Sequence, residues 1–567
     1  MIVSLYNYIQ LLTSFVNYST SGLYPVQFAE NKMNSIMQIY SAKHKYALLL
    51  MVAVGLTATG AMGLAADSYA QKIDDGMDGY VVGSPDGGAG IYTGNPNECW
   101  WDSDGDGVLD MYCLIDTGDT AWMITASSLV LFMTPGVAFL YGGLARSKNA
   151  VNTIGMTFIV MGLMSVQWVL WGYSLAFGSV DTEANMFMGN LDYMGFNQVS
   201  AWAPLGEPGP CEGTWSDYYQ MQQMKSLDAG MCSQGWPGTV PHQLFAMFQA
   251  TFAIITPALI VGGLVDRMKF SALVIFVLLW GTFVYDPIAH WVWGGGYIGN
   301  MDFDPDLSPS YGLDFAGGTV VHISSGFAAL AGALVLGRRL GYGKVPMEPH
   351  NIPMVVLGAS ILWFGWFGFN AGSEVLSDGI AVSAWTVTNT ATGMASVTWL
   401  LMSWGHTGRP SIAGAATGAV AGLVAITPAS GWVGPMASII IGVAAGTVCY
   451  GAVAFKNARK WDDALDVWGV HGIGGFTGAI LTGTLASPHV WDTGDGIGAW
   501  TGTPEGYEQQ AINIAGACLS VAYAFGVTIV ILKIMDAIWP GGIRVTPKEE
   551  EVGLDIAQNG ERAYVNE

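Results

Sequence analysis

The clearest shortage in this 567-residue sequence is charge. Only 11% of its residues are charged, whereas soluble proteins average about a quarter, so a soluble globular fold is excluded for most of the chain. The 20 Lys and Arg residues are outnumbered by 43 Asp and Glu residues, and the formal net charge of −23 argues against nucleic acid as a partner. The histidines also lack the i, i+4 spacing of a helical metal site, which argues against a membrane metalloenzyme.

In place of charge, the sequence has long apolar runs and 77 glycines, a residue that lets membrane helices approach closely. Eleven runs reach about 20 residues, the length that spans a bilayer as a helix. They lie near 121–142, 150–178, 242–264, 270–286, 315–337, 354–373, 379–404, 411–427, 436–455, 467–486 and 511–537. We therefore predict an all-α polytopic membrane protein with eleven transmembrane helices.

Basic residues set the predicted orientation, because they follow every second run. These residues include Arg146, Arg267, Arg339, Arg409, Arg459 and Arg544, and the alternate loops hold only Lys225. The positive-inside rule then places the N-terminus outside and the C-terminus inside. With five helices per half, the second half is inverted relative to the first. Such an inverted five-helix repeat commonly holds its site near the bilayer midplane.

The first 70 residues are predicted to be a targeting segment, with a signal peptide at about 37–70. Lys43 and Lys45 precede the run "ALLLMVAVGLTATGAMGLAA", and a small-residue cleavage site follows at Ala70. The residues before Met37 fit a start codon placed too early, and an uncleaved extra helix is the alternative. Residues 71–120 are then an acidic extracellular segment, 121–537 the membrane domain and 538–567 a cytoplasmic tail. We expect a multi-pass protein of the plasma membrane.

Four of the six cysteines fall in the predicted outer segments, where an oxidising environment favours disulfides. They are Cys99, Cys113, Cys211 and Cys232, and three pairings are possible.

The stretch "DSDGDGVLD" resembles the first half of a calcium loop. Its candidate ligands are Asp102, Asp104, Asp106 and Asp110. The twelfth position of the loop is Cys113 instead of Glu, so the motif is not a complete EF-hand. Calcium is therefore the one candidate cofactor, and an acidic solvated loop is the alternative.

Two ionisable pairs interrupt the apolar runs, in "DFAGGTVVHI" and "DVWGVHGIGG". His322 follows Asp314 by eight residues, about 12 Å along a helix, and His471 follows Asp466 by five, so both histidines are predicted inside the membrane. A buried ionisable residue there is a functional candidate by default, although two neutral imidazoles can also form a purely structural pair. Helix capping is the favoured role for Asp466. For Asp314, capping and an electrostatic role in cation binding both stay open.

Aromatic side chains recur in or just after three of the apolar runs. "LFAMFQATF" places Phe248 and Phe252 on one helical face, "HWVWGGG" places Trp293 at a helix end, and "WFGWFGFNAGS" contains Phe369 and Ser373. Such residues usually serve packing or form an interface belt. Tryptophan is also the best cation–π partner, so a cation site is the alternative.

Several stretches, in this order, resemble the ammonium transporter family (Amt/Mep/Rh). They are "TPGVAFLYGGLARSKN", "FQATFAIITPALIVGGLVDRMKFSA", "PIAHWVWGGG", "LDFAGGTVVHI", "PHNIPMVVLGASILWFGWFGFNAGS", "DVWGVHGIGG" and the tail "GGIRVTPKEEEVGLDIAQNGERAY". The resemblance covers about residues 121–564 and not the first 120. It implies an eleven-helix homotrimer with one pore per subunit, and Trp293 with "GFNAGS" favours the Amt branch over the Rh branch.

The resemblance also implies roles for individual residues. Trp293, Phe252 and Ser373 correspond to an outer ammonium-recruiting site, supported by Asp314. Phe252 and Phe369 correspond to a stacked phenyl gate. His322 and His471 correspond to the twin histidines of the pore, and they are expected to be neutral because burial disfavours charge on either ring. The tail resembles the family's regulatory tail, which implies a PII-type signal protein as a partner.

The predicted function is therefore ammonium transport, with no enzymatic activity. One alternative is an Rh-type channel that passes ammonia or carbon dioxide without net charge, and Trp293 and Ser373 count against it. A second is an ammonium sensor on the same fold. Such a sensor would need a signalling domain, and the tail after Lys548 is too short for a kinase.

Overall fold

The computed structural model describes most of the membrane region and three short strands before it. The described residues are 91–92, 99–101 and 110–112, for their backbone only, and then 115–180, 182–201, 240–301, 311–487, 490 and 498–564. The predicted targeting segment and the residues Asp102, Asp104, Asp106, Cys113, Cys211 and Cys232 lie outside this range.

Three short strands form an antiparallel sheet in the segment predicted to be acidic and extracellular, where no strand was predicted. They are β1 (Ile91–Tyr92), β2 (Cys99–Trp101) and β3 (Asp110–Tyr112), in the order β1-β2-β3. Ile91 lies opposite Trp100, and Cys99 lies opposite Tyr112.

All the regular structure described after residue 115 is helical, as predicted. The label η marks short 3₁₀ or π-helical segments. The first half consists of α4 (Thr117–Leu144), η1 (Ser147–Asn149), α5 (Ala150–Gln167), η2 (Trp168–Gly172), α6 (Tyr173–Phe177), η3 (Glu183–Met186), η4 (Met194–Phe196), α8 (His242–Leu264), α9 (Phe270–Trp280), η5 (Gly281–Tyr285), α10 (Asp286–Trp293), η6 (Gly318–Ile323) and α11 (Ser324–Leu336).

The second half and the tail continue in the same way. They consist of α12 (Ile352–Ala371), η7 (Gly372–Glu374), α13 (Gly379–Thr407), α14 (Ile412–Ile426), η8 (Thr427–Ala429), α15 (Pro435–Arg459), η9 (Trp468–Gly472), α16 (Ile473–Leu485), η10 (Ala499–Thr501), α18 (Pro504–Ile538), α19 (Pro547–Val552) and η11 (Asp555–Asn559).

The eleven apolar runs of the sequence each coincide with helical structure. Within the described residues, nine helices are long and apolar enough to cross a membrane. The other two runs coincide with α13 and with η9 followed by α16. Polar residues mark several helix starts. The side chains of Asp378, Ser411 and Thr503 accept backbone N–H groups of α13, α14 and α18, which satisfies donors that a helix leaves free at its N-terminus.

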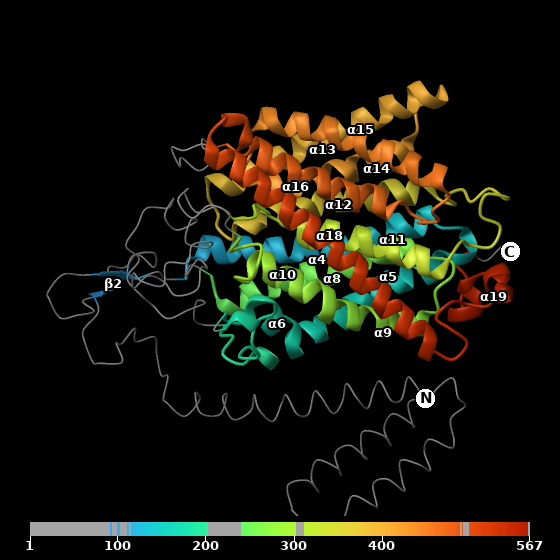
Figure 1. Ribbon diagram of the computed structural model, residues 1–567, viewed down its shortest axis with the longest axis horizontal. Helices are drawn as coiled ribbons and strands as arrows, with labels where there is room; N and C mark the ends of the chain where they lie inside the picture. Colours follow the sequence, from blue (N-terminus) through green and yellow to red (C-terminus); the bar gives the residue numbers. More distant parts are fainter. Residues whose placement is uncertain are drawn as a thin grey trace, which may run out of the picture. The chain divides into compact units, whose positions relative to one another are not determined.

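The two halves pack by the same plan, as the predicted repeat requires. In the first half α4 packs against α5 and α8, and α5 packs against α8 and α9; in the second half α12 packs against α13 and α14, and α13 packs against α14 and α15. The halves meet along α4 and α12 and where η6 and η9 contact each other. The long α18, drawn in red, crosses the bundle and packs against α11 and α16 (Figure 1).

Candidate functional site

The two predicted intramembrane histidines lie side by side, each on a π-helical segment. His322 is on η6 and His471 on η9, and only 0% and 3% of their surfaces are exposed. Their Nδ1 atoms are 3.3 Å apart. One ring must donate a proton to the other at this contact, because two lone pairs would repel. Short π-helical segments occur often at functional sites, and each histidine lies on one, although η2, η5 and η11 are π-helical as well.

A column of aromatic rings continues from His322. The ring of Phe369 stacks on that of His322 with centroids 5.8 Å apart, and the rings of Phe252 and Phe369 are 4.5 Å apart. Trp293 contacts Phe252 in an edge-to-face arrangement, with centroids 5.8 Å apart. Trp366 also stacks on His322, at 5.3 Å, a contact that was not predicted. The structure thus brings Trp293, the two predicted gate residues and the two histidines into one continuous series.

Trp293 and Ser373, two residues of the predicted recruiting site, both donate hydrogen bonds to backbone carbonyl oxygens. The indole N–H of Trp293 donates to the carbonyl oxygen of Asp314 at 3.0 Å. The hydroxyl of Ser373 donates to the carbonyl oxygen of Phe369 at 2.8 Å, which leaves its oxygen lone pairs able to accept. Trp293 and Ser373 are partly exposed, unlike the buried rings of Phe252 and Phe369.

The side chain of Asp314 caps the start of η6. Its two carboxylate oxygens accept the backbone N–H groups of Gly317, Gly318, Thr319 and Val320 at 2.6–3.3 Å. These contacts use the sites with which a carboxylate would hold a cation, and they fix the backbone that precedes His322. The geometry therefore favours capping, one of the two roles left open for Asp314.

The residue that caps the second histidine segment is Asp463, so the predicted role of Asp466 is wrong. Asp463 is fully buried, and its carboxylate accepts the N–H of Trp468 at 2.8 Å. Asp466 instead pairs with Lys456 at 2.5 Å. The sequence contained the signal, since Asp463 precedes His471 by eight residues, the same separation as between Asp314 and His322.

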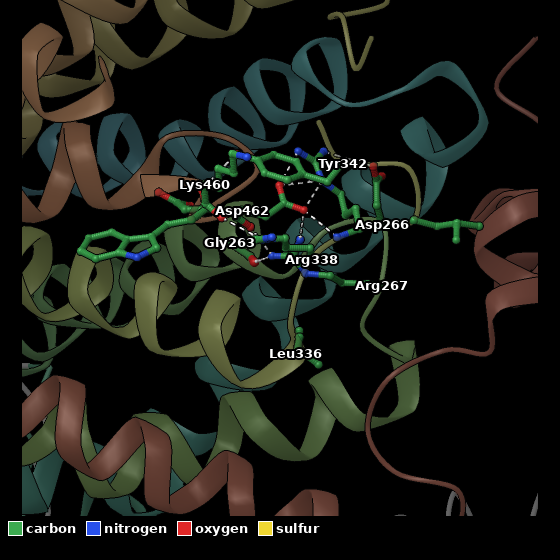
Figure 2. Close-up of polar contacts among 12 residues, drawn as sticks. Gly263, Asp266, Arg267, Leu336, Arg338, Tyr342, Lys460 and Asp462 are labelled. Carbon is green, nitrogen blue, oxygen red and sulfur yellow. Dashed lines mark hydrogen bonds and ion pairs between the residues drawn. The ribbon is translucent and has the colours of Figure 1, made fainter. Parts of the chain in front are cut away.

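A buried ion network joins the loops at the opposite end of the helices from Trp293. Asp462 contacts Arg267 at 2.8 Å (Figure 2). Asp462 also contacts Arg339 at 2.7 Å, and Asp266 contacts Arg146 at 2.9 Å and Arg339 at 3.3 Å. Burial by itself raises the pKa of Asp462, but the two guanidinium groups outweigh burial and hold that pKa below its ordinary value. The arginines that were used to predict the orientation therefore also form ion pairs that hold these loops together.

The C-terminal tail is attached to this same end of the bundle (Figure 1). Lys148 donates to the carbonyl oxygens of Glu550 and Glu551 at 2.8 and 2.7 Å. Asp555 accepts the backbone N–H of Asn152 at 2.8 Å. Asn149, which precedes α5, provides no side-chain cap for that helix, so the tail supplies the cap.

The candidate calcium ligands belong to the segment that precedes α4. Asp102, Asp104 and Asp106 fall outside the described residues, and only the backbone of Asp110 is described. In the part of the chain that is described, no group of three His, Cys, Asp or Glu residues could hold a metal ion.

The helices and the buried histidine pair define the class of protein as a polytopic helical membrane protein. The model of the Ammonium Transporter Family matches residues 121–564. An ammonium transporter of Aquifex aeolicus (strain VF5) is 44% identical over 452 residues, which is 79% of this chain and 94% of that protein. An ammonium transporter of Bacillus subtilis (strain 168) is 42% identical over 449 residues, 79% of this chain and 98% of the relative.

A solved structure supports the same assignment. The crystal structure of Candida albicans Mep2 matches with a TM-score of 0.65 and 35% identity, over 77% of this chain and 88% of that chain. The chain therefore belongs to the ammonium transporter family. This membership confirms the predicted family, the all-α membrane fold, the multi-pass membrane location and the assignment to transporters instead of enzymes.

Proposed function

We propose that the protein transports ammonium across the membrane, along a path lined by the aromatic column and the two histidines. The assignment of ammonium as the substrate rests on membership of the ammonium transporter family. The observation that carries the path is the unbroken series of contacts from Trp293 through Phe252 and Phe369 to His322 and His471.

The chemistry of this series suits an ion that can lose its charge. Trp293 offers an aromatic face and Ser373 a hydroxyl oxygen, which together hold a small cation briefly. The rings of Phe252 and Phe369 then exclude water, so any permanent cation must cross without its hydration shell. Ammonium can release a proton and continue as ammonia, whereas potassium cannot. The neutral histidine pair offers ammonia hydrogen-bonding groups and can take up or pass on a proton.

The assembly and orientation are part of this proposal. We propose eleven transmembrane helices with the N-terminus outside and the C-terminus inside, and a homotrimer with one pore per subunit. The docked tail is proposed to regulate the pore and to meet a PII-type signal protein on the cytoplasmic side. Support comes from the tail contacts with Lys148 and Asn152, two residues at the end of the bundle where the basic loops lie.

Two further proposals concern the outer segment. We propose disulfides among Cys99, Cys113, Cys211 and Cys232, and calcium bound by Asp102, Asp104, Asp106 and Asp110. Intact mass with and without a reductant tests the disulfides, and four free thiols in exported protein would refute them. A melting temperature that does not change when a chelator is added would refute the calcium site.

Currents recorded from purified protein in liposomes test the transport proposal. The protein is reconstituted on a supported membrane, and the bath is switched to ammonium or to potassium. We expect a current with ammonium and none above the empty-liposome background with potassium. Uptake of ammonia without any current would instead favour the Rh-type gas channel.

A further inference from the structure

Each histidine of the pair is followed four residues later by a glycine. The sequences are "HISSG" at His322–Gly326 and "HGIGG" at His471–Gly475. Both glycines lie in the first turn of the helix that continues from the histidine segment, α11 for Gly326 and α16 for Gly475. The two histidine helices therefore carry a matching glycine at the same position.

The two glycines make reciprocal contacts. Gly326 packs against the backbone of His471 and Gly472, and a Cβ added at Gly326 would lie 2.9 Å from the His471 carbonyl carbon and still closer to Gly472. Gly475 packs against the segment that carries His322. A Cβ added there would lie 2.7 Å from the carbonyl oxygen of Gly318 and 2.9 Å from the Cβ of His322.

These contacts leave no room for even one methyl group. Carbon atoms in van der Waals contact are about 3.5–4.0 Å apart, so an alanine at Gly475 must move the His322 backbone away by roughly 0.6 Å or more. The neighbouring atoms belong to backbone and to a Cβ, which cannot swing aside as a flexible side chain can. The helices themselves must separate.

We propose that Gly326 and Gly475 are positioning residues that set the distance between the two histidine rings and thereby the selectivity of the pore. The Nδ1 atoms are 3.3 Å apart, which is already near the long limit of a hydrogen bond. A separation of the helices by about 0.6 Å takes this contact beyond that limit. This inference rests on the proposed transport function, because it assigns the histidine pair to the pore.

Tight glycine packing elsewhere in the chain does not have this consequence. Gly442, on α15, packs against α13 as closely, since an added Cβ would lie 2.6 Å from the carbonyl oxygen of Ala391. Neither α13 nor α15 carries a pore histidine. Gly442 therefore offers a control for helix strain alone, and Gly526 on α18, where an added Cβ meets nothing within 4 Å, offers a control for the substitution itself.

A graded series of alanine substitutions tests the proposal. Protein labelled with ¹⁵N-histidine is prepared as wild type, Gly326→Ala, Gly475→Ala, Gly472→Ala, Gly442→Ala and Gly526→Ala. Solid-state NMR measures the nitrogen–nitrogen coupling across the histidine pair, and liposome currents give the ratio of ammonium to potassium response. Gly472→Ala is the milder change, because its added Cβ lies 3.3 Å from the nearest atom of Gly326.

We expect the coupling to disappear and the ammonium-to-potassium ratio to fall roughly tenfold in Gly326→Ala and Gly475→Ala, the size expected for one lost buried hydrogen bond. Gly472→Ala should lose less, and the two controls should keep the wild-type ratio. If Gly326→Ala and Gly475→Ala fail to fold, the Gly472→Ala measurement decides.

A wild-type coupling and a wild-type current ratio in Gly326→Ala and Gly475→Ala would overturn the proposal. If these two variants do not fold, the same result in Gly472→Ala would overturn it. An equal loss of the current ratio in Gly442→Ala would overturn it as well. Wild-type protein without any ammonium response would instead overturn the proposed function, and the NMR coupling would still report on the glycines.

Discussion

Phe369 has contacts on both sides that make it the central residue of the aromatic column. Its ring touches Phe252 at 4.5 Å, Trp366 at 5.0 Å and His322 at 5.8 Å, and none of its surface is exposed. A ring in this position separates the partly exposed Trp293 from the buried histidines. Its removal should therefore connect water at one side with the histidine pair at the other.

Replacing Phe369 with alanine tests this role. We expect the ammonium-to-potassium current ratio to fall by about tenfold or more, because water that enters the vacated space lowers the cost of passing a hydrated ion. Truncating a buried phenylalanine should also cost about 3–5 kcal/mol of stability. The matched control is Phe367→Ala on the same helix, since Phe367 stacks on Trp385 at 4.5 Å outside the column. A wild-type ammonium-to-potassium current ratio in Phe369→Ala would contradict the proposed gate role of Phe369.

At the residue scale, the sequence predicted the members of the column but not all of its contacts. Trp293, Phe252, Phe369 and the histidines were chosen by motif, and the structure places them in series. The stacking of Trp366 on His322 was not predictable, because it depends on how α12 is rotated against η6. The identity of the second capping acid was missed for a different reason. Asp463 and Asp466 both precede the helix, and the nearer acid was chosen although Asp463 has the same eight-residue separation from its histidine as Asp314 has.

At the scale of single elements, α5 depends on a group supplied by the tail. The carboxylate of Asp555 accepts the N–H of Asn152 in the first turn of α5, and Leu554 donates its N–H to the side chain of Asn149 at 2.7 Å. Asp555 is thus 403 residues away in sequence from the residue whose N–H it accepts. Capping motifs are local in sequence, so no sequence pattern could have revealed this one.

The change Asp555→Ala should release the tail from α5. We expect a loss of about 1 kcal/mol of stability, the usual cost of removing a helix cap, together with faster proteolysis after Lys548 and an altered ammonium flux. The control is Glu561→Ala, because the side chain of Glu561 is exposed. Equal protease resistance and equal flux in wild type and Asp555→Ala would contradict a regulatory docking of the tail.

At the scale of the whole molecule, the ion network joins loops from both halves of the chain. Arg146, Asp266 and Arg267 come from the first half, and Asp462 comes from the second. The sequence revealed the repeat and the helices through hydrophobic length and the spacing of basic residues. It could not show that these arginines pair inside the protein, because the sequence of a loop does not indicate whether its charged side chains are exposed to water or form buried ion pairs.

The network predicts a specific pH dependence of stability. The folded pKa of Asp462 is lower than the unfolded one, since the guanidinium groups outweigh the effect of burial. Its ion pairs therefore stabilise the fold above the ordinary aspartate pKa of about 3.9, and this stabilisation is lost as the pH falls through the lower folded value.

Thermal unfolding of Asp462→Asn and of wild type in detergent, as a function of pH, checks this dependence. Near neutral pH we expect the variant to be less stable by about 3–5 kcal/mol, as for other broken buried ion pairs. The difference should shrink in acid, where the wild type loses the same charge. The exposed Glu561→Gln serves as the control. A difference that is constant between pH 7 and pH 3 would contradict this role for Asp462.

The most direct test of the whole account is the current carried by histidine variants. Wild type, His322→Leu, His471→Leu and the double variant are reconstituted in liposomes and exposed to ammonium and to potassium. We predict that each single variant loses its ammonium current or its discrimination against potassium, because the remaining ring is left without its partner in a dry site. The double variant should be no worse than either single one, since the two rings act as a unit. Full current and full selectivity in both single variants would contradict the account and leave the histidine pair with a structural role alone.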